Sequence, residues 1–253
     1  MSASEQWDRE ALEQAVHDMW VDRKHGTQSG QHMKHVEDLL SDYILRLSGA
    51  AALQIKTGKA ARLPGFYRPR KDWDLVVMDG KRLLVAIEAK SQDVEKLASN
   101  ANNRVEEAVG SATDLRLVHQ RGKVGKPLEG WAPWLGYLFI LEDARAATNR
   151  PRQAVTNLFD VDPVYGRYPS YARRYQVLCQ RLVDTDLYDG ACFMLSPMAP
   201  KRGITEPKPE DGDLKVDITF SGFLTSLTDY LEKYLANRQG PAPSDHRGQQ
   251  LQL

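Results

Sequence analysis

Apolar and polar positions along this chain repeat with two different spacings, which predict helices and strands in separate segments. A helical spacing puts apolar residues on one stripe in the segments 5–22, 31–48, 94–119, 170–186 and 221–236. Short apolar runs predict strands at 75–78, 83–87, 134–141 and 191–195. Helices and strands in this order predict an α/β fold, in which helices flank a central mixed β-sheet.

The first two predicted strands are joined by a short turn, which indicates a β-hairpin. Asp79 and Gly80 separate the apolar runs, and Asp-Gly is typical of a tight turn between antiparallel strands. Residues 83–87 are continuously apolar, so we expect this strand to be buried on both faces. The hairpin brings the start of its first strand beside the end of its second.

Three polar side chains meet at the open end of this hairpin. Asp74 opens the first strand, while Glu88 and Lys90 close the second and, being two residues apart, project from the same face. Two carboxylates and an amine at one place suit one hard divalent cation and one activated water. The alternative is a surface hairpin with a solvated Glu88–Lys90 pair, and the apolar strand before these residues argues against it.

Glu37 is a further candidate, because it lies on the apolar stripe of the helix predicted over 31–48. It stands between Met33 and Leu40 at helical spacing. A carboxylate that faces inward needs a cation, a metal or a hydrogen-bond donor. Glu37 could bond to a metal-bound water above the hairpin or pair with a base such as Lys90. A partly exposed position at the edge of the stripe is the alternative.

Composition bounds the class of protein. With 42% hydrophobic and 27% charged residues among 253, the chain resembles soluble globular proteins. It has neither an apolar membrane span nor a signal-peptide pattern, so we expect a cytoplasmic protein with no membrane contact. The spacing of Cys179 and Cys192 predicts buried free thiols. We expect a single domain over 1–237 and a disordered polar tail over 238–253.

The net charge is zero, which argues against a protein that coats nucleic acid indiscriminately. Cations nevertheless cluster in one segment that contains no acid: Lys56, Lys59, Arg62, Arg68, Arg70 and Lys71. This cluster leads directly into Asp74, with Phe66 and Tyr67 interleaved, and the adjacency favours phosphate contacts beside a cleavage site. A solvated charged face is the alternative.

Several longer motifs carry a resemblance to a known family. They are Gly-Phe-Tyr-Arg-Pro at 65–69, Glu-Ala-Lys-Ser-Gln at 88–92, Asn-Asn-Arg-Val-Glu-Glu-Ala at 102–108, Trp-Leu-Gly-Tyr at 134–137 and Ser-Tyr-Ala-Arg-Arg-Tyr at 170–175. Together with Asp74 and Glu88-x-Lys90 they resemble the XhoI family of type II restriction endonucleases, within the PD-(D/E)XK nuclease superfamily. The similarity runs from about residue 30 to 235. Trp73 replaces the usual proline of the motif.

The resemblance implies a metal-dependent nuclease site. Asp74, Glu88 and the carbonyl of Ala89 are expected to bind Mg²⁺, which prefers oxygen ligands. Lys90 is expected to orient the attacking water rather than to act as a strong base, because neighbouring carboxylates favour its charged form. Glu37 is expected to act on the metal site, as a helical glutamate does in several enzymes of this superfamily.

The resemblance also implies a target and a mode of binding. The enzyme is expected to be a homodimer that cuts double-stranded DNA at the palindrome CTCGAG, leaves 5′-phosphate ends and is encoded near a companion DNA methyltransferase. Side chains expected to contact DNA are Arg68, Arg70, Lys71, Gln92, Asn102, Asn103 and Arg104. For Gln92 a structural role is an equal alternative, and for 102–104 a solvated helix surface is the alternative to base contacts.

Other functions remain open at this point. A different PD-(D/E)XK nuclease, acting in repair or on DNA junctions, would share the site and ignore the palindrome. A DNA-binding protein that has lost activity would have no physical reason to keep two repelling carboxylates together. An interaction scaffold is supported by the polar C-terminal tail alone.

Overall fold

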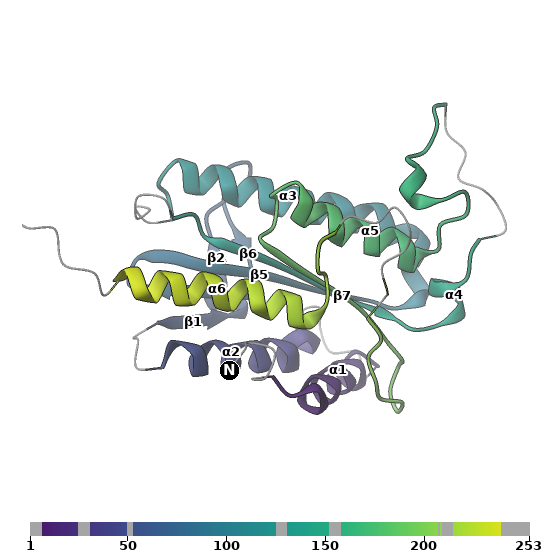
Figure 1. Ribbon diagram of the computed structural model, residues 1–253, viewed down its shortest axis with the longest axis horizontal. Helices are drawn as coiled ribbons and strands as arrows, with labels where there is room; N and C mark the ends of the chain where they lie inside the picture. Colours follow the sequence, from purple (N-terminus) through teal and green to yellow (C-terminus); the bar gives the residue numbers. More distant parts are fainter. Residues whose placement is uncertain are drawn as a thin grey trace, which may run out of the picture.

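A mixed five-stranded β-sheet with strand order β1-β4-β5-β6-β7 forms the centre of the protein (Figure 1). This computed structural model describes residues 7–24, 31–49, 53–124, 131–151, 158–206, 208 and 215–238. The strands are β1 (Gln54–Thr57), β4 (Leu75–Asp79), β5 (Arg82–Gln92), β6 (Trp134–Glu142) and β7 (Gly190–Ser196). β4 pairs with β1 and β5 in antiparallel fashion, whereas β5, β6 and β7 are parallel.

Helices cover both faces of the sheet, so the predicted α/β fold is confirmed. One layer contains α3 (Leu97–Gln120) and α5 (Tyr171–Asp184), and the other contains α1 (Arg9–Lys24), α2 (Lys34–Ser48) and α6 (Phe220–Arg238) (Figure 1). Shorter elements are η2 (Gln31–Met33), η3 (Gly58–Ala61), η4 (Val94–Lys96), α4 (Arg145–Thr148) and η5 (Pro163–Tyr165). A separate two-stranded ribbon joins β2 (Arg62–Leu63) to β3 (Lys71–Asp72).

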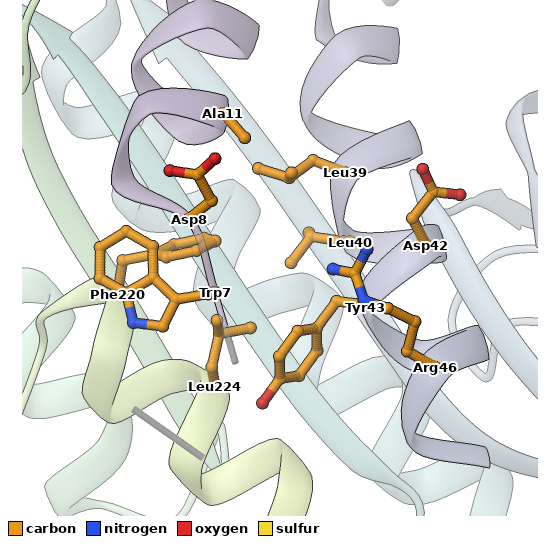
Figure 2. Close-up of a pocket in the computed structure, with 10 residues that line it drawn as sticks. All are labelled: Trp7, Asp8, Ala11, Leu39, Leu40, Asp42, Tyr43, Arg46, Phe220 and Leu224. Atoms are coloured by element: carbon orange, nitrogen blue, oxygen red, sulfur yellow. The ribbon is translucent and has the colours of Figure 1, made fainter. Parts of the chain in front are cut away.

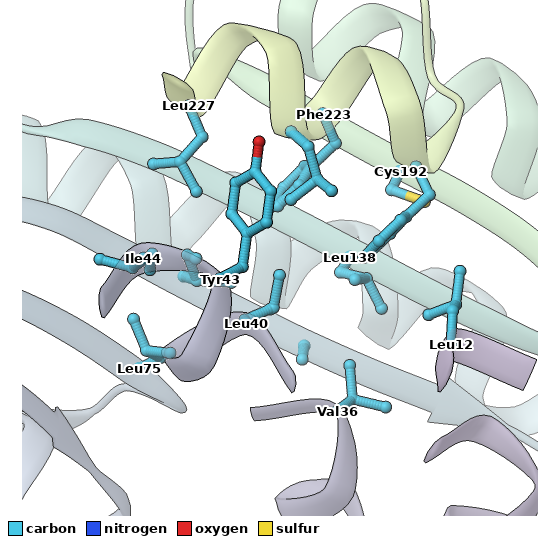
Figure 3. Close-up of a cluster of buried hydrophobic side chains, with 14 of the residues drawn as sticks. Leu12, Val36, Leu40, Tyr43, Ile44, Leu75, Leu138, Cys192, Phe223 and Leu227 are labelled. Atoms are coloured by element: carbon cyan, nitrogen blue, oxygen red, sulfur yellow. The ribbon is translucent and has the colours of Figure 1, made fainter. Parts of the chain in front are cut away.

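The hydrophobic core divides into two clusters, one on each face of the sheet. Between the sheet and α1, α2 and α6, side chains such as Leu40, Leu138 and Phe223 are buried together (Figure 3). Tyr43 is buried there as well, and its hydroxyl bonds with Thr228 Oγ1 at 2.7 Å. The second cluster packs α3 and α5 against the opposite face. Burial on both faces explains why the strands read as continuous apolar runs.

The structure differs from the sequence prediction at β5, which continues beyond Ile87 to Gln92. Glu88 and Lys90 therefore lie within the strand, where β6 provides the pairing from Val85↔Trp134 to Gln92↔Leu141. β4 ends its pairing at Leu75↔Ile87, so the last residues of β5 have β6 on one side only. The candidate catalytic residues thus occupy the carboxyl end of a parallel strand, where ligands of open α/β sheets bind.

Strand β7 lies at an edge of the sheet, and other segments satisfy part of that edge. Leu195 N donates to Thr205 O and Thr205 N to Leu195 O, both at 2.8 Å. Phe193 N donates to Ile218 O at 2.9 Å. The segment 196–217, predicted to be a long loop, therefore pairs with the sheet over part of its described residues.

Two further predictions concern burial and the chain ends. Both cysteines, Cys179 and Cys192, are free and buried, as predicted. No helix in the described parts of the chain is long and apolar enough to cross a membrane. The predicted tail begins where α6 ends at Arg238, and residues 239–253 lie outside the described part of the structure.

Candidate active site

The β4–β5 hairpin brings Asp74 and Glu88 opposite each other. Leu75 pairs with Ile87, and Asp74 N donates a hydrogen bond to Ile87 O at 3.2 Å, which extends the ladder by one residue. Asp74 Oδ2 in turn accepts a hydrogen bond from Ala89 N at 2.7 Å. This bond fixes the Asp74 carboxylate beside the strand that carries Glu88.

Glu88 contacts two lysine side chains deep in the protein. Lys71 Nζ lies 2.5 Å from Glu88 Oε2, and Lys90 Nζ forms an ion pair with Glu88 Oε1. Only 3% of the Glu88 side chain is exposed, against 12% for Lys71 and 23% for Lys90. Lys90 is thus the more accessible of the two ammonium groups, and it is the one on the same strand face as the carboxylate.

The charges of this cluster influence one another strongly. Burial and the nearby Glu88 charge raise the pKa of Asp74 to about 6. Burial also opposes ionisation of Glu88, but the ammonium groups of Lys90 and Lys71 outweigh it and lower the pKa of Glu88. Burial disfavours the charge on Lys90, yet the Glu88 and Asp74 carboxylates raise its pKa. A charged Lys90 orients water and stabilises negative charge but does not accept a proton.

Glu37 lies close to the same cluster and faces inward from α2. The residue is 7% exposed, as its place on the apolar stripe suggested. Burial and the negative charges of Asp74 and Asp38 raise its pKa to about 8. No ion pair of Glu37 exists among the described residues, and Asp74, rather than Lys90, is the group of the site whose charge acts on it. A protonated Glu37 can donate a hydrogen bond; an ionised Glu37 adds negative charge beside Asp74.

The donor set at the hairpin fits a cation that takes few protein ligands. The described residues hold no group of three or more His, Cys, Asp or Glu side chains arranged for a metal. Mg²⁺ commonly binds one or two protein carboxylates and keeps several waters, so Asp74 and Glu88 are sufficient ligands for it. A zinc site made of several side chains is absent from the described residues. A divalent ion would also relieve the repulsion that raises the pKa of Asp74.

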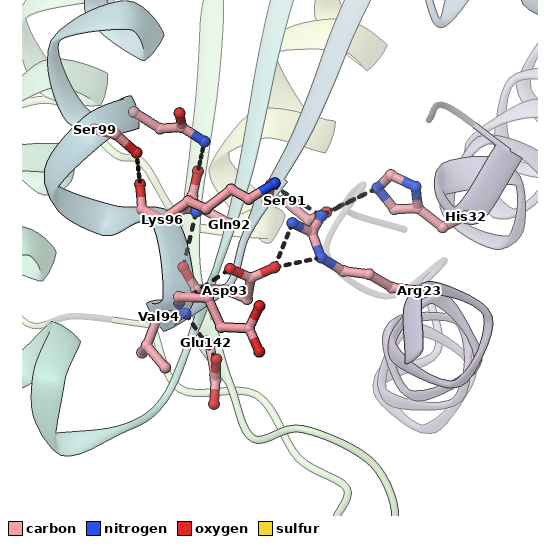
Figure 4. A network of polar contacts seen from close by, with 11 residues as sticks. Arg23, His32, Ser91, Gln92, Asp93, Val94, Lys96, Ser99 and Glu142 are labelled. Atoms are coloured by element: carbon pink, nitrogen blue, oxygen red, sulfur yellow. Dashed lines mark hydrogen bonds and ion pairs between the residues drawn. The ribbon is translucent and has the colours of Figure 1, made fainter. Parts of the chain in front are cut away.

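The residue next to Lys90 is anchored to the N-terminal helices (Figure 4). Ser91 Oγ accepts a hydrogen bond from Arg23 Nη1 at 2.8 Å and contacts His32 Nε2 at 3.0 Å. Arg23 also binds Asp93 Oδ2 through Nη2 at 2.6 Å and Nε at 2.9 Å. Burial, and then the charges of Arg23 and Lys90, lower the pKa of His32 to about 4. This network fixes the end of β5, and no pattern in the sequence indicated its pairing.

Three cations expected at DNA lie in the segment 68–71, and two of them, Lys71 and Arg68, contact acidic side chains. Lys71 contacts Glu88 and lies 4.9 Å from the centroid of the Trp73 ring, so it belongs to the catalytic cluster itself. Arg68 Nε donates to the buried Asp114 carboxylate at 2.9 Å, although 42% of the Arg68 side chain remains exposed. Arg70 is exposed. Asp114 is a residue that the sequence did not reveal as part of this region.

The polar residues expected at DNA fall into two groups. Gln92 is fully buried, and its amide donates to Asp93 O at 2.8 Å and accepts from Asn100 at 3.2 Å. This amide braces the end of β5 and has no exposed surface for a phosphate, which favours the structural alternative. Asn102 and Asn103 are exposed on α3, and Asn102 accepts a hydrogen bond from Arg174 Nη2 at 3.0 Å.

Arg104 points from α3 toward the cluster. Its Nη1 donates to Glu107 Oε2 at 2.6 Å, and its charge acts on Lys90 and on the buried hydroxyl of Tyr175. Its Nε is buried and, among the described residues, has no hydrogen-bond partner. The Arg104 side chain is 19% exposed, so a phosphate could reach the guanidinium only through its accessible part and not through Nε.

A well-formed pocket of the described structure lies away from this cluster. It has a volume of about 320 Å³ and opens between α1, α2 and α6 (Figure 2). Its walls are mostly apolar, with Asp8, Asp42 and Arg46 among the lining residues. None of the hairpin residues lines it.

Comparison with known proteins identifies the family of the chain. Residues 14–205 match the family of restriction endonuclease XhoI, and the match includes every candidate catalytic residue. The chain belongs to the XhoI restriction endonuclease family. Its departure from the usual motif, Trp73, is buried, and the side chain contacts Lys71 instead of solvent.

Three type II restriction enzymes are similar to this chain. BstVI, a type II restriction enzyme of Geobacillus stearothermophilus, is 36% identical over 172 residues, which cover 66% of this chain and 74% of BstVI. The type II enzyme XhoI of Xanthomonas vasicola is 39% identical over 142 residues, 55% of each chain. The type II enzyme AbrI of Azospirillum brasilense is 36% identical over 135 residues, 51% of this chain and 60% of AbrI. No solved structure matches.

Proposed function

We propose that this protein is a type II restriction endonuclease that hydrolyses phosphodiester bonds of double-stranded DNA with the help of Mg²⁺. The observation that carries the proposal is the Asp74–Glu88–Lys90 cluster at the carboxyl end of β5, in a chain of the XhoI family. Two carboxylates kept together at the cost of a raised Asp74 pKa are hard to explain as a purely structural feature.

Asp74 and Glu88 would hold the metal ion, with the Ala89 carbonyl as a backbone ligand and Glu37 in support. When bound, Mg²⁺ supplies charge stabilisation to the phosphate and lowers the pKa of a water molecule. Asp74 is kept in place for this role by Ala89 N, and Glu88 is kept ionised by two lysines. Both oxygens of Glu88 face ammonium groups, so a metal ion bound to Glu88 would use the remaining lone pairs of these oxygens or displace a lysine contact.

Lys90 would orient the attacking water and stabilise the negative charge that develops on the phosphate. Its raised pKa keeps it charged at neutral pH, so it acts as a donor. Arg104, whose charge acts on Lys90 and whose side chain is partly exposed, would add a second positive group near the same phosphate or its neighbour. Three exposed residues remain candidates for contacts with the DNA: Arg70, Asn102 and Asn103.

We further propose that the target is the palindrome CTCGAG, that cleavage leaves 5′-phosphate ends, and that the enzyme acts as a homodimer. Two-fold symmetry of the protein matches two-fold symmetry of the DNA, with one active site for each strand. A restriction enzyme also requires protection of host DNA, so a companion methyltransferase is expected to be encoded nearby.

The test is digestion of a plasmid that contains a single CTCGAG site, in Mg²⁺ and in EDTA, followed by sequencing of the ends. One Mg²⁺-dependent cut at that site with 5′-phosphate ends would support the proposal in full. Cuts at other places would retain the nuclease and reject the target. Binding without cleavage in any divalent metal would reject the enzyme in favour of an inactive DNA-binding protein.

A further inference from the structure

The β2–β3 ribbon projects a short loop from the edge of the active site. Arg62 pairs with Asp72 and Leu63 with Lys71, so residues 64–70 form the tip of the ribbon. At its base, Lys71 contacts Glu88, and the Trp73 N–H donates to Ala61 O at 3.1 Å. The ribbon is therefore anchored on the catalytic cluster, and whatever binds there meets the tip as well.

A buried carboxylate holds the tip in one conformation. Asp114 Oδ1 accepts hydrogen bonds from the backbone N–H groups of Phe66 and Tyr67, both at 2.7 Å, and Oδ2 accepts one from Arg68 Nε at 2.9 Å. Asp114 is 2% exposed. A Cβ atom at Gly65 would lie 2.5 Å from both Arg68 O and Asp114 Oδ2, so only glycine fits there. The tip is a built structure and does not need DNA to order it.

This clamp displays two aromatic rings to solvent. Tyr67 is 74% exposed and Phe66 is 43% exposed, and the rings meet edge to face with centroids 4.9 Å apart. The Arg121 guanidinium lies 5.4 Å from the Phe66 centroid. Exposed aromatic surface is costly in water, so a rigid loop that maintains it indicates a binding partner.

The charge around the rings favours DNA as that partner. Segment 56–71 contains no acidic residue, and Asp114, the carboxylate beneath the tip, is buried and paired with Arg68. Three exposed cations are near the rings. Arg121 lies over the Phe66 ring, Arg70 follows Tyr67 by three residues, and Lys123 follows Arg121 by two. Among the described residues the other strongly exposed aromatic is Phe159, at 86%, and it is followed by the exposed Asp160, whose charge would repel phosphates. The surroundings of Phe66 and Tyr67, unlike those of Phe159, therefore complement a polyanion such as DNA.

The reach of the ribbon sets where the rings would act. Lys71 is four positions beyond Tyr67, so their Cα atoms lie within about 14 Å of each other even if the chain is fully extended. Bases follow one another every ~3.4 Å along a strand, so this distance corresponds to about four base steps from a phosphate bound beside Lys71. The rings therefore lie within or just beside a six-base-pair target.

We propose that Phe66 and Tyr67 form an aromatic wedge that contacts bases of the DNA near the cleaved bond and opens one base step. The proposal rests on the nuclease function above and extends it to a residue pair with no metal or catalytic role. Apolar side chains that enter a stacked duplex unstack and kink it, and the enzyme recovers that cost through its other contacts. Base–aromatic contact adds affinity that does not depend on salt, because no phosphate counterion is released.

The experiment measures cleavage and binding on one set of duplexes. Each carries CTCGAG, with 2-aminopurine in place of one adenine of the site or of its flanks, within four steps of the cut; cleavage is measured in Mg²⁺ and binding in Ca²⁺. With the wild type we expect fluorescence at one position to rise on binding. Tyr67→Ala should abolish that rise and weaken binding by about tenfold or more, without a change in the salt dependence of binding.

Three variants serve as controls. Tyr67→Phe keeps the ring and should behave as the wild type, whereas Phe159→Ala removes an exposed ring in an acidic setting and should also have no effect. Arg70→Ala should lower the salt dependence, which identifies a phosphate contact and separates it from the aromatic one. Circular dichroism confirms that each variant is folded; Tyr67 is mostly exposed, so its replacement should leave the fold intact.

The outcomes separate this inference from the proposed function. A wild type that cleaves, together with a Tyr67→Ala variant that binds and unstacks normally, would overturn the wedge and leave the nuclease untouched. A Tyr67→Ala variant that changes from dimer to monomer in sedimentation would overturn it in favour of contact with a second copy of the chain. A wild type that neither cleaves nor binds these duplexes would reject the nuclease proposal and the wedge together.

Discussion

The β4–β5 hairpin carries acidic side chains at both of its ends, and the two ends differ in how those charges are balanced. At the turn, Asp79 Oδ2 accepts a hydrogen bond from the Tyr234 hydroxyl at 2.6 Å and lies 3.3 Å from Arg238 Nε. At the open end, two ammonium groups contact Glu88 and act on Asp74, Glu37 has no ion pair among the described residues, and the pKa values of Asp74 and Glu37 are raised.

The difference shows how one hairpin can serve stability at one end and chemistry at the other. The turn end has one carboxylate and partners that satisfy it, which is the arrangement expected of a structural contact. The open end has three carboxyl groups and two ammonium groups, so a bound divalent ion would stabilise it more than the turn end. Substitutions at the open end should therefore lower cleavage and leave the fold intact. Substitutions at the turn end should lower stability and leave cleavage nearly unchanged.

The largest expected effect is the loss of cleavage in Glu88→Ala. This change removes a proposed metal ligand, and we expect the cleavage rate to fall by at least about a thousandfold. The two lysines freed by the change are partly exposed and can turn toward solvent, so folding and Ca²⁺-supported DNA binding should persist. Plasmid cleavage and circular dichroism measure the two properties. An unfolded variant would instead identify Glu88 as a structural residue.

A smaller loss of cleavage is expected for Lys90→Gln, because the substitution removes a charged donor but keeps both carboxylates. The rate of the chemical step should fall by about a hundredfold at saturating Mg²⁺. Lys71→Gln is the matched comparison: it removes the other ammonium group from Glu88, which is the less exposed one, and should cost about tenfold. Single-turnover cleavage measures both. Equal losses would mean that the two lysines act only through Glu88.

The open end should also make stability depend on pH in the absence of divalent ions. Glu37, with a folded-state pKa of about 8, and Asp74, with about 6, bind protons more tightly in the folded protein than in the unfolded chain. Their stabilising contribution is complete below about pH 4 and is lost as pH rises through 6 for Asp74 and through 8 for Glu37. Each group contributes a slope of at most about 1.4 kcal/mol per pH unit.

Glu37→Gln isolates one of these two groups. The variant should lose part of the decline in stability between pH 6 and pH 8, because the amide that replaces the carboxyl group does not ionise. Urea unfolding in EDTA, repeated at several pH values, measures the difference from the wild type. Parallel pH profiles for the two proteins would show that Glu37 ionises in the folded state as readily as in the unfolded chain.

The smallest expected effect belongs to the turn end. Asp79→Ala removes the acceptor of the Tyr234 hydroxyl bond, and we expect a loss of about 1 to 2 kcal/mol in the free energy of unfolding. Cleavage should remain within about twofold of the wild type. Urea unfolding and plasmid cleavage on the same preparation provide the test. A loss of cleavage as large as that of Lys90→Gln would remove the distinction between the two ends.

The sequence was informative where local rules decide the geometry. The Asp-Gly turn predicted the hairpin, and the pleat of a strand aligns Glu88 with Lys90. The register that sets Leu75 against Ile87, and so Asp74 against Glu88, also depends on a β-bulge between Val77 and Met78, which the sequence pattern does not show. The helical stripe likewise indicated that Glu37 faces inward. These residues needed no knowledge of distant partners.

Features that depend on pairing between distant segments could not be predicted in this way. β1 is short and carries polar residues, and β2 and β3 contain two residues each, so no periodic pattern marks them. Without that ribbon, Lys71 reads as one cation of a surface cluster, whereas the structure directs it to Glu88. The burial of Gln92 follows from the extension of β5 alongside β6, which is also a tertiary effect.

The partly satisfied edge at β7 has a consequence for how two copies of this chain could assemble. The N–H groups of Phe193 and Leu195 already donate to Ile218 and Thr205 of the same chain. A neighbouring molecule therefore finds few free groups there with which to continue the sheet across a subunit boundary. Continuation of the sheet across such a boundary would instead have to use the opposite edge, at β1.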